Sequence, residues 1–201
     1  MFTRVSSVLV ALALLWVVGC SSVPTEQIAT TDKAFESAKA AEAEQYAAMS
    51  FQMAMDTLNA AKVEQQAQDG KFSLLRSYDK SRDLYAAAER LAAQAVTDAA
   101  AEKQRVQEEV RTLLADAETL MATVDAAVKA APVAKGTRAD IELLKADFTA
   151  AQTSFSDARA DFDAGSFLTA RTKANSTMEK LQSIMTQIEE AKARKTTRSK
   201  T

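Results

Sequence analysis

Apolar side chains recur every seven residues along much of the chain, with a second row three or four positions later. This spacing is typical of helices that pack side by side. Two such patterns follow one another after residue 137. The first holds Ile141, Leu144, Phe148, Ala151, Phe155, Ala158 and Phe162, and the second holds Phe167, Ala170, Ala174, Thr177, Leu181, Ile184, Ile188 and Ala191. We predict two antiparallel helices, 137–164 and 166–194, joined at Gly165.

A longer pattern predicts one helix over 72–131. Its first row holds Tyr78, Tyr85, Ala92, Ala99, Val106, Leu113, Leu120 and Ala127. The companion row, four positions later, is mostly polar from Arg82 to Lys103 and apolar from Val110 onward. A wider apolar face accommodates more than one neighbour. We expect the preceding helix to pack on the early half, and the 137–194 hairpin on the late half.

The helix predicted over 26–68 is less regular. Tyr46, Met49 and Met53 form an apolar stripe along it. Methionine fills irregular gaps, so the stripe fits a malleable core. The alternative is a groove for a partner helix or a lipid chain.

Turn residues are scarce, since the 201 residues include only four Gly and two Pro. A fold of many strands needs more of them. The breaks fall at Asp69-Gly70, at 132–136 and at Gly165. We therefore predict an all-α chain of elongated antiparallel hairpins, a coiled-coil-like bundle of about four helices. The first hairpin covers 26–131 and the second covers 137–194.

The N-terminal segment resembles a targeting signal. An apolar run from Val8 to Val18 precedes the only cysteine, Cys20. As a helix this run measures about 16 Å, against the 30 Å or so of bilayer hydrocarbon. It is too short for a stable span and suits the core of a secretory signal peptide.

The end of that run, Val17-Val18-Gly19-Cys20, resembles the bacterial lipobox. The resemblance implies a signal peptide over 1–19, cleavage before Cys20, acylation of Cys20 with chains such as palmitate, and a tether over 20–25. Ser21 at the next position favours the outer membrane in the enteric sorting pattern, where Asp would favour the inner membrane. The alternative is a secreted protein with one stray thiol.

One stretch of the first hairpin resembles a known family. The residues that carry it are Tyr46-Ala47, Ala54, Leu58, Ala61 and Asp69-Gly70-Lys71-Phe72. They are similar to the alanine-rich helical domain of unknown function 4398 of bacterial envelope lipoproteins. This chain has Glu42-Ala43-Glu44 where the family often has a Gly-containing step. The resemblance implies a helical fold and an envelope location, and no activity.

Composition argues against most catalytic designs. The chain has no His, which is the commonest general base and metal ligand, and one Cys forms no intrachain disulfide or zinc cluster. Asp157 and Asp161 share a helix face, a weak cation candidate beside Arg159. We expect no catalytic residues, no metal site and no cofactor beyond lipid on Cys20. An envelope enzyme or metal-dependent regulator is the rival reading.

Charge is uneven along the chain. Residues 20–191 carry 19 basic and 27 acidic side chains, whereas the C-terminus is wholly basic. Its cations are Lys192, Arg194, Lys195, Arg198 and Lys200. A basic tail over 195–201 suits an anionic surface such as peptidoglycan, lipid phosphate or an acidic envelope protein. It equally suits a frayed, solubilising helix end.

Together these features predict a lipid-anchored protein on the periplasmic face of the outer membrane. We expect a non-catalytic structural or protein-interaction module, with its membrane contact through the lipid anchor and no nucleic-acid partner. The alternative function is a carrier of lipid or another hydrophobic ligand. The apolar heptad rows can pack either within one chain or between two copies of it, so the sequence does not determine the oligomeric state.

Overall fold

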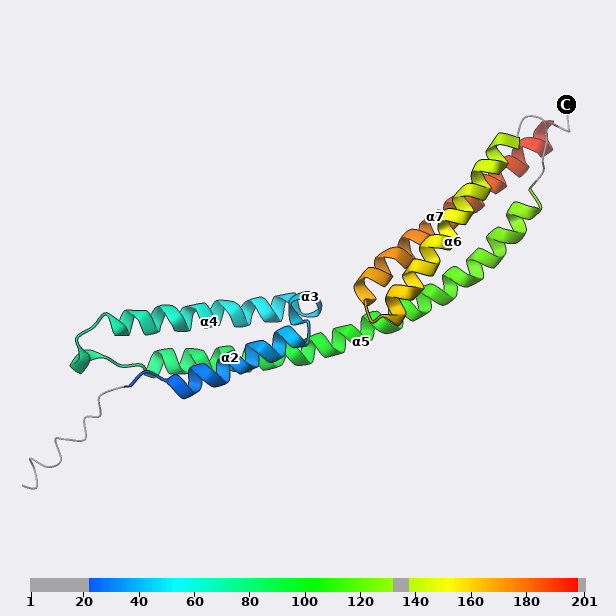
Figure 1. Cartoon of the computed structure of the whole chain (residues 1–201). Coiled ribbons are helices and arrows are strands. Elements are labelled where there is room, and N and C mark those ends of the chain that lie inside the picture. The colour runs from blue at the N-terminus through cyan, green and yellow to red at the C-terminus, as the bar shows by residue number, and fades with distance from the viewer. Residues whose placement is uncertain (1–21, 132–137, 199–201) are drawn as a thin grey trace, which may run out of the picture. The chain divides into compact units, whose positions relative to one another are not determined.

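The computed structural model describes residues 22–131 and 138–198, and within these ranges every regular element is helical (Figure 1). The predicted all-α class is confirmed. The chain divides into two compact units, one up to Glu102 and one from Lys103. We call them unit 1 and unit 2 and describe each by itself. Helix α5 (Asp79–Lys129) is unbroken and contributes its first part to unit 1 and its second to unit 2.

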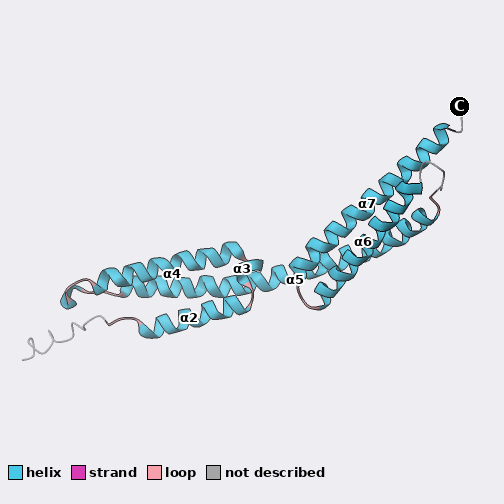
Figure 2. Cartoon of the chain, turned by 45° about the horizontal axis from the view of Figure 1, so that its top comes forward, coloured by secondary structure: helices cyan, strands magenta, loops and turns pink. Residues whose placement is uncertain are grey.

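Unit 1 is built from α2 (Thr25–Ala40), α4 (Ala48–Asp69) and the first part of α5, which lie side by side (Figures 1 and 2). Ser50 donates a hydrogen bond to Asp98 at 2.5 Å, and Tyr85 donates one to Gln65 at 2.7 Å. The pairing runs in opposite directions along the two helices, so α4 is antiparallel to α5. The residues of the helix predicted over 26–68 thus pack on the early half of α5, as expected, but they do so as two helices, α2 and α4, where one was predicted.

Helix α2 lies against both α4 and α5. Gln27 donates a hydrogen bond to Glu89 of α5 at 2.5 Å. The rings of Phe35 and Phe51 meet edge to face, with centroids 6.0 Å apart, and join α2 to α4. Burying such a pair adds its specific ring contact to the apolar area removed from water.

The single helix predicted over 26–68 is wrong, because the chain turns back between α2 and α4. Glu42 sits in the left-handed region at φ 57°. Its N–H closes α2 on the Lys39 carbonyl, and its own carbonyl accepts the N–H of Tyr46 in the short helix α3 (Ala43–Tyr46). Position 42 falls where the resembling family often has its Gly-containing step, and Gly adopts this conformation without strain.

The helix predicted to begin at residue 72 begins instead at Asp79. A loop over 70–78 precedes it and contains one turn of 3-10 helix, η2 (Ser73–Leu75). The described residues therefore hold six α-helices, where four were predicted. The heptad row already indicated this later start, because its first apolar residue is Tyr78 and the position seven residues earlier is Lys71.

Unit 2 combines the second part of α5 with α6 (Arg138–Asp163) and α7 (Phe167–Arg198). Its core contains Val124, Val128, Leu144, Phe148, Ala151, Leu181, Ile184 and Ile188. The predicted rows of α6 and α7 supply six of these side chains and α5 supplies Val124 and Val128, so the predicted rows of α6 and α7 do face the core. Residues 132–136, predicted as a turn, lie outside the described ranges, and α7 continues four residues past its predicted end at 194.

The α6–α7 turn is closed by a Schellman motif. The Gly165 N–H bonds to the Phe162 carbonyl at 3.0 Å, and the Ser166 N–H bonds to the Asp161 carbonyl at 2.8 Å. Gly165 lies at φ 80°, which is the left-handed position that this motif requires. Phe167 then packs on Phe162, with ring centroids 5.4 Å apart.

Candidate functional site

The predicted anchor, Cys20, lies outside the described residues, as does Lys200. The backbone of Arg194, Lys195 and Arg198 belongs to α7, but their side chains are not described. Lys192 is the one predicted tail cation with a described side chain. It is exposed and forms an ion pair with Glu189 one turn earlier, at 3.0 Å. This pairing fits a solvated helix face, and an anionic surface would have to compete with Glu189.

The methionine stripe does not act as one surface. Tyr46 is buried, whereas Met49 is 81% exposed and Met53 is 53% exposed. The core of α4 uses the opposite face, through Phe51 and Leu58. Neither methionine lines the hollows described below, so nothing here favours the lipid groove that the stripe suggested.

One carboxylate of the predicted cation candidate near the α6–α7 turn, Asp161, is paired with a cation of the same chain. The Lys173 ammonium lies 2.6 Å from the Asp161 carboxylate. This hydrogen bond raises the pKa of Lys173, while partial desolvation acts the other way. Over the described ranges, no three Asp, Glu, His or Cys side chains are arranged to hold a metal ion.

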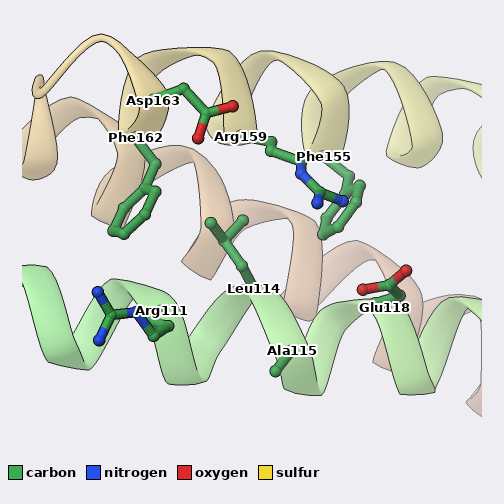
Figure 3. Close-up of a pocket in the computed structure, with 8 residues that line it drawn as sticks. All are labelled: Arg111, Leu114, Ala115, Glu118, Phe155, Arg159, Phe162 and Asp163. Carbon is green, nitrogen blue, oxygen red and sulfur yellow. The ribbon is translucent and has the colours of Figure 1, made fainter.

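A shallow hollow of about 210 Å³ opens between α5 and α6 of unit 2. Figure 3 shows Leu114 rising from α5 between the rings of Phe155 and Phe162. Charged side chains, Arg159 and Glu118 among them, surround this apolar floor. Sites for small organic ligands usually exceed about 300 Å³ and enclose most of the ligand. This hollow is smaller and open, so it makes a poor ligand site.

The surface feature that sequence reasoning missed is the loop between α4 and α5. Phe72, Leu74 and Leu75 lie within four residues of one another in the sequence, and their side chains are 69%, 76% and 72% exposed. We call these three side chains the apolar tip. The sequence placed them inside a helix, where their exposure was not foreseeable. Exposed apolar side chains that gather in one place mark interaction sites more often than scattered ones do.

The loop that carries the apolar tip is held by its own polar groups. The buried Gln68 side chain accepts hydrogen bonds from the Ser77 N–H at 3.2 Å and from the Lys71 ammonium at 3.0 Å. Arg76 donates to the Asp69 and Lys71 carbonyls, both at 2.9 Å. These bonds close the C-terminal end of α4 and hold the backbone of the loop in place.

A further bond pins the loop to the start of α5. The Tyr78 hydroxyl donates to Asp69 at 2.5 Å. This bond to a carboxylate is the main reason that the pKa of Tyr78 is raised, with desolvation second. Nearby, Lys80 pairs with Glu64 at 2.7 Å, and this hydrogen bond, followed by that from Gln68, lowers the pKa of Glu64. The apolar tip is therefore displayed by an ordered framework.

The apolar tip lies at the end of unit 1 where the described chain begins. A second hollow is lined by Ser22, Pro24 and Thr25 together with Arg82. Arg82 is only four residues, or about 6 Å of helix, beyond Tyr78 at the end of the loop. In Figures 1 and 2 the start of α2 and the α4–α5 loop share one end of the unit. The segment that leads back to Cys20 thus leaves the unit close to the apolar tip.

Comparison with known proteins identifies no relative: no family model, no curated protein and no solved structure matches this chain. The resemblance to the envelope-lipoprotein domain stays a prediction. Function must therefore be argued from the residues themselves.

Proposed function

We propose that this chain is a bacterial lipoprotein, acylated at Cys20 and held on the periplasmic face of the outer membrane, where its helices serve as a non-catalytic interaction module. The observation that carries the proposal is the position of the only cysteine. It directly follows an apolar run and the Val17-Val18-Gly19 triplet. Two or three acyl chains on one residue anchor a protein far more firmly than one chain does.

The described helices are compatible with this role. None of the helices in the described ranges is long and apolar enough to cross a bilayer. The two units offer solvated helical faces. An interaction module needs such faces and an attachment point more than it needs an enclosed pocket.

The anchor is tested by expressing the full chain in a Gram-negative host and determining the mass of its N-terminal peptide. We expect a peptide that begins at Cys20 and carries a diacylglyceryl group and an amide-linked acyl chain. Cys20→Ser should abolish this mass and release the protein from the membrane, whereas Ser21→Ala should preserve both. An unmodified thiol at Cys20 in the exported protein would contradict the proposal.

The destination and the partner are tested in the same cells. Ser21→Asp should move the protein from outer-membrane to inner-membrane fractions. In-cell crosslinking followed by mass spectrometry should recover a defined envelope protein or murein fragments. If deletion of 192–201 removes that product, the basic tail forms the contact. If no specific product forms with the full chain, the interaction role fails and the lipid-carrier alternative takes precedence.

A further inference from the structure

We propose that the apolar tip, Phe72, Leu74 and Leu75, inserts into the same membrane surface that holds the acylated Cys20, and so gives unit 1 a second point of membrane contact. This inference rests on the proposed lipid anchor. It goes further because it assigns a membrane-binding role to residues of the folded body.

The first argument is the exposure of large apolar side chains on an ordered loop. Each of the three is more than two-thirds exposed, while Gln68, Arg76 and Tyr78 hold the backbone around them. Transfer of apolar surface out of water is favourable in proportion to its area. Because the loop is already ordered, insertion costs little further conformational entropy.

The second argument is the reach of the anchor. Cys20 is two residues before Ser22, and two extended residues span at most about 7 Å. Ser22 lines the same hollow as Arg82, and Arg82 is about one helical turn from the end of the loop. Lipid chains on Cys20 would therefore place a bilayer at this end of unit 1, where the apolar tip is exposed together with Val63 of the last turns of α4.

The third argument is charge. Residues 70–78 include two cations, Lys71 and Arg76, and no carboxylate. A bilayer surface combines apolar chains with anionic headgroups, so it matches an apolar cluster flanked by cations. Aromatic residues such as Phe72 are also suited to the depth just below the headgroups.

The test uses tryptophan as a reporter. The only Trp in the chain, Trp16, lies in the segment that the proposed cleavage removes. Phe72→Trp or Leu74→Trp then gives a mature protein with a single Trp on the apolar tip. Met49→Trp is the matched control, because Met49 is exposed at the opposite end of α4. The acylated proteins are reconstituted into phosphatidylethanolamine–phosphatidylglycerol vesicles, with and without brominated acyl chains.

We expect all three proteins to float with the vesicles. The Trp at position 72 or 74 should emit at shorter wavelength on vesicles and lose about half of its emission to bromine, as expected for burial some 5–10 Å into the interface. The Trp at position 49 should keep its emission. Circular dichroism should show unchanged helicity, since all three replaced side chains are exposed.

The outcomes separate the two proposals. Proteins that float while the Trp at 72 and 74 stays unquenched overturn the membrane contact and leave the anchor intact. Proteins that carry no acyl chain and do not float overturn the anchor, and the inference falls with it. A blue shift that appears without lipid and grows with protein concentration assigns the apolar tip to a second copy of the chain, which also overturns it.

Discussion

Several buried hydroxyl groups in this protein form hydrogen bonds with carbonyl groups of their own helix. Thr31, Ser81 and Thr177 have no exposed surface, and each hydroxyl donates to a main-chain carbonyl three or four residues earlier. A buried hydroxyl without such a partner would cost free energy, so the local carbonyl makes burial tolerable. Thr177 was foreseeable because it falls in a heptad row. Thr31 and Ser81 were not, because neither lies in one of the heptad rows that we identified in the sequence.

The Tyr78–Asp69 bond makes unit 1 sensitive to alkaline pH. Because the folded state raises the pKa of Tyr78, the unfolded chain loses this proton first as pH rises. The stabilisation is fully present below the ordinary pKa of 10.0 and is lost as pH rises through the folded value. Asp69→Asn removes the charge but keeps an acceptor. We expect the phenol to titrate at lower pH in this variant, as measured by phenolate absorbance with Tyr78→Phe as the reference for assignment.

The titration of Tyr78 must be distinguished from that of Tyr85. The burial of Tyr85 also raises its pKa, but its hydroxyl bonds to the neutral Gln65. The charges of Asp32 and Asp69 raise the pKa of Tyr85 further, after desolvation. Asp69→Asn should therefore lower the titration of Tyr85 less than that of Tyr78, because Tyr85 loses a distant charge and Tyr78 loses its hydrogen-bonded carboxylate. A variant curve identical to that of the unmodified protein would show that the Asp69 charge does not act on Tyr78.

The predicted helices differ from the observed ones mainly at their ends and less in their interiors. Gly165-Ser166-Phe167 and Gly70-Lys71-Phe72 look alike in sequence, yet they build different connections. Gly165 has φ 80° and closes a tight turn, whereas Gly70 lies in the right-handed region at φ −71° and leads into a nine-residue loop. Only the first needs glycine. At the α2–α3 junction the left-handed position is occupied by Glu42, so composition gave no warning of the break.

The two glycines should respond oppositely to alanine. A Cβ at Gly165 meets nothing within 4 Å but must adopt a positive φ, so Gly165→Ala should destabilise unit 2 by about 1 kcal/mol. A Cβ at Gly70 makes only ordinary contacts at 3.8 and 3.9 Å. Gly70→Ala should be neutral or stabilising by about 0.4–1 kcal/mol, because it restricts the unfolded chain. Urea unfolding of both variants measures the difference, and equal effects would refute this distinction.

The chain as a whole contains two cores on one shared helix. The core of unit 1 is rich in alanine, and α5 contributes Ala88, Ala92, Ala95 and Ala99 to it. The core of unit 2 holds larger aliphatic side chains, among them Leu181 and Ile184. Each unit therefore has its own source of stability. Local unfolding of one unit should not require the loss of the other core.

Leu181→Ala tests this independence. Leu181 is fully buried, so its truncation should cost about 2–5 kcal/mol. Leu143, 60% exposed on α6, is the matched control, and Leu143→Ala should change stability by less than about 0.5 kcal/mol. Amide hydrogen exchange should quicken in α6 and α7 of the Leu181 variant and stay slow in α4. A matching loss of protection in α4 would show that the units unfold together.

Periodicity in the sequence determined the helical class, the α6–α7 hairpin and the rows that form the core of unit 2, because side chains at fixed helical spacing must share a buried face. It also fixed the candidate anchor at Cys20, which depends on local motif alone. The tertiary structure decided what local pattern does not encode. The chain turns at Glu42, α5 begins only at Asp79, and the early part of α5 buries Ser81 and Ala88 beside its first heptad row, where the companion row is mostly polar. Hydrogen bonds of Gln68, Arg76 and Tyr78 hold the loop between the two helices in a form that leaves Phe72, Leu74 and Leu75 exposed, and no local pattern in the sequence encodes these bonds.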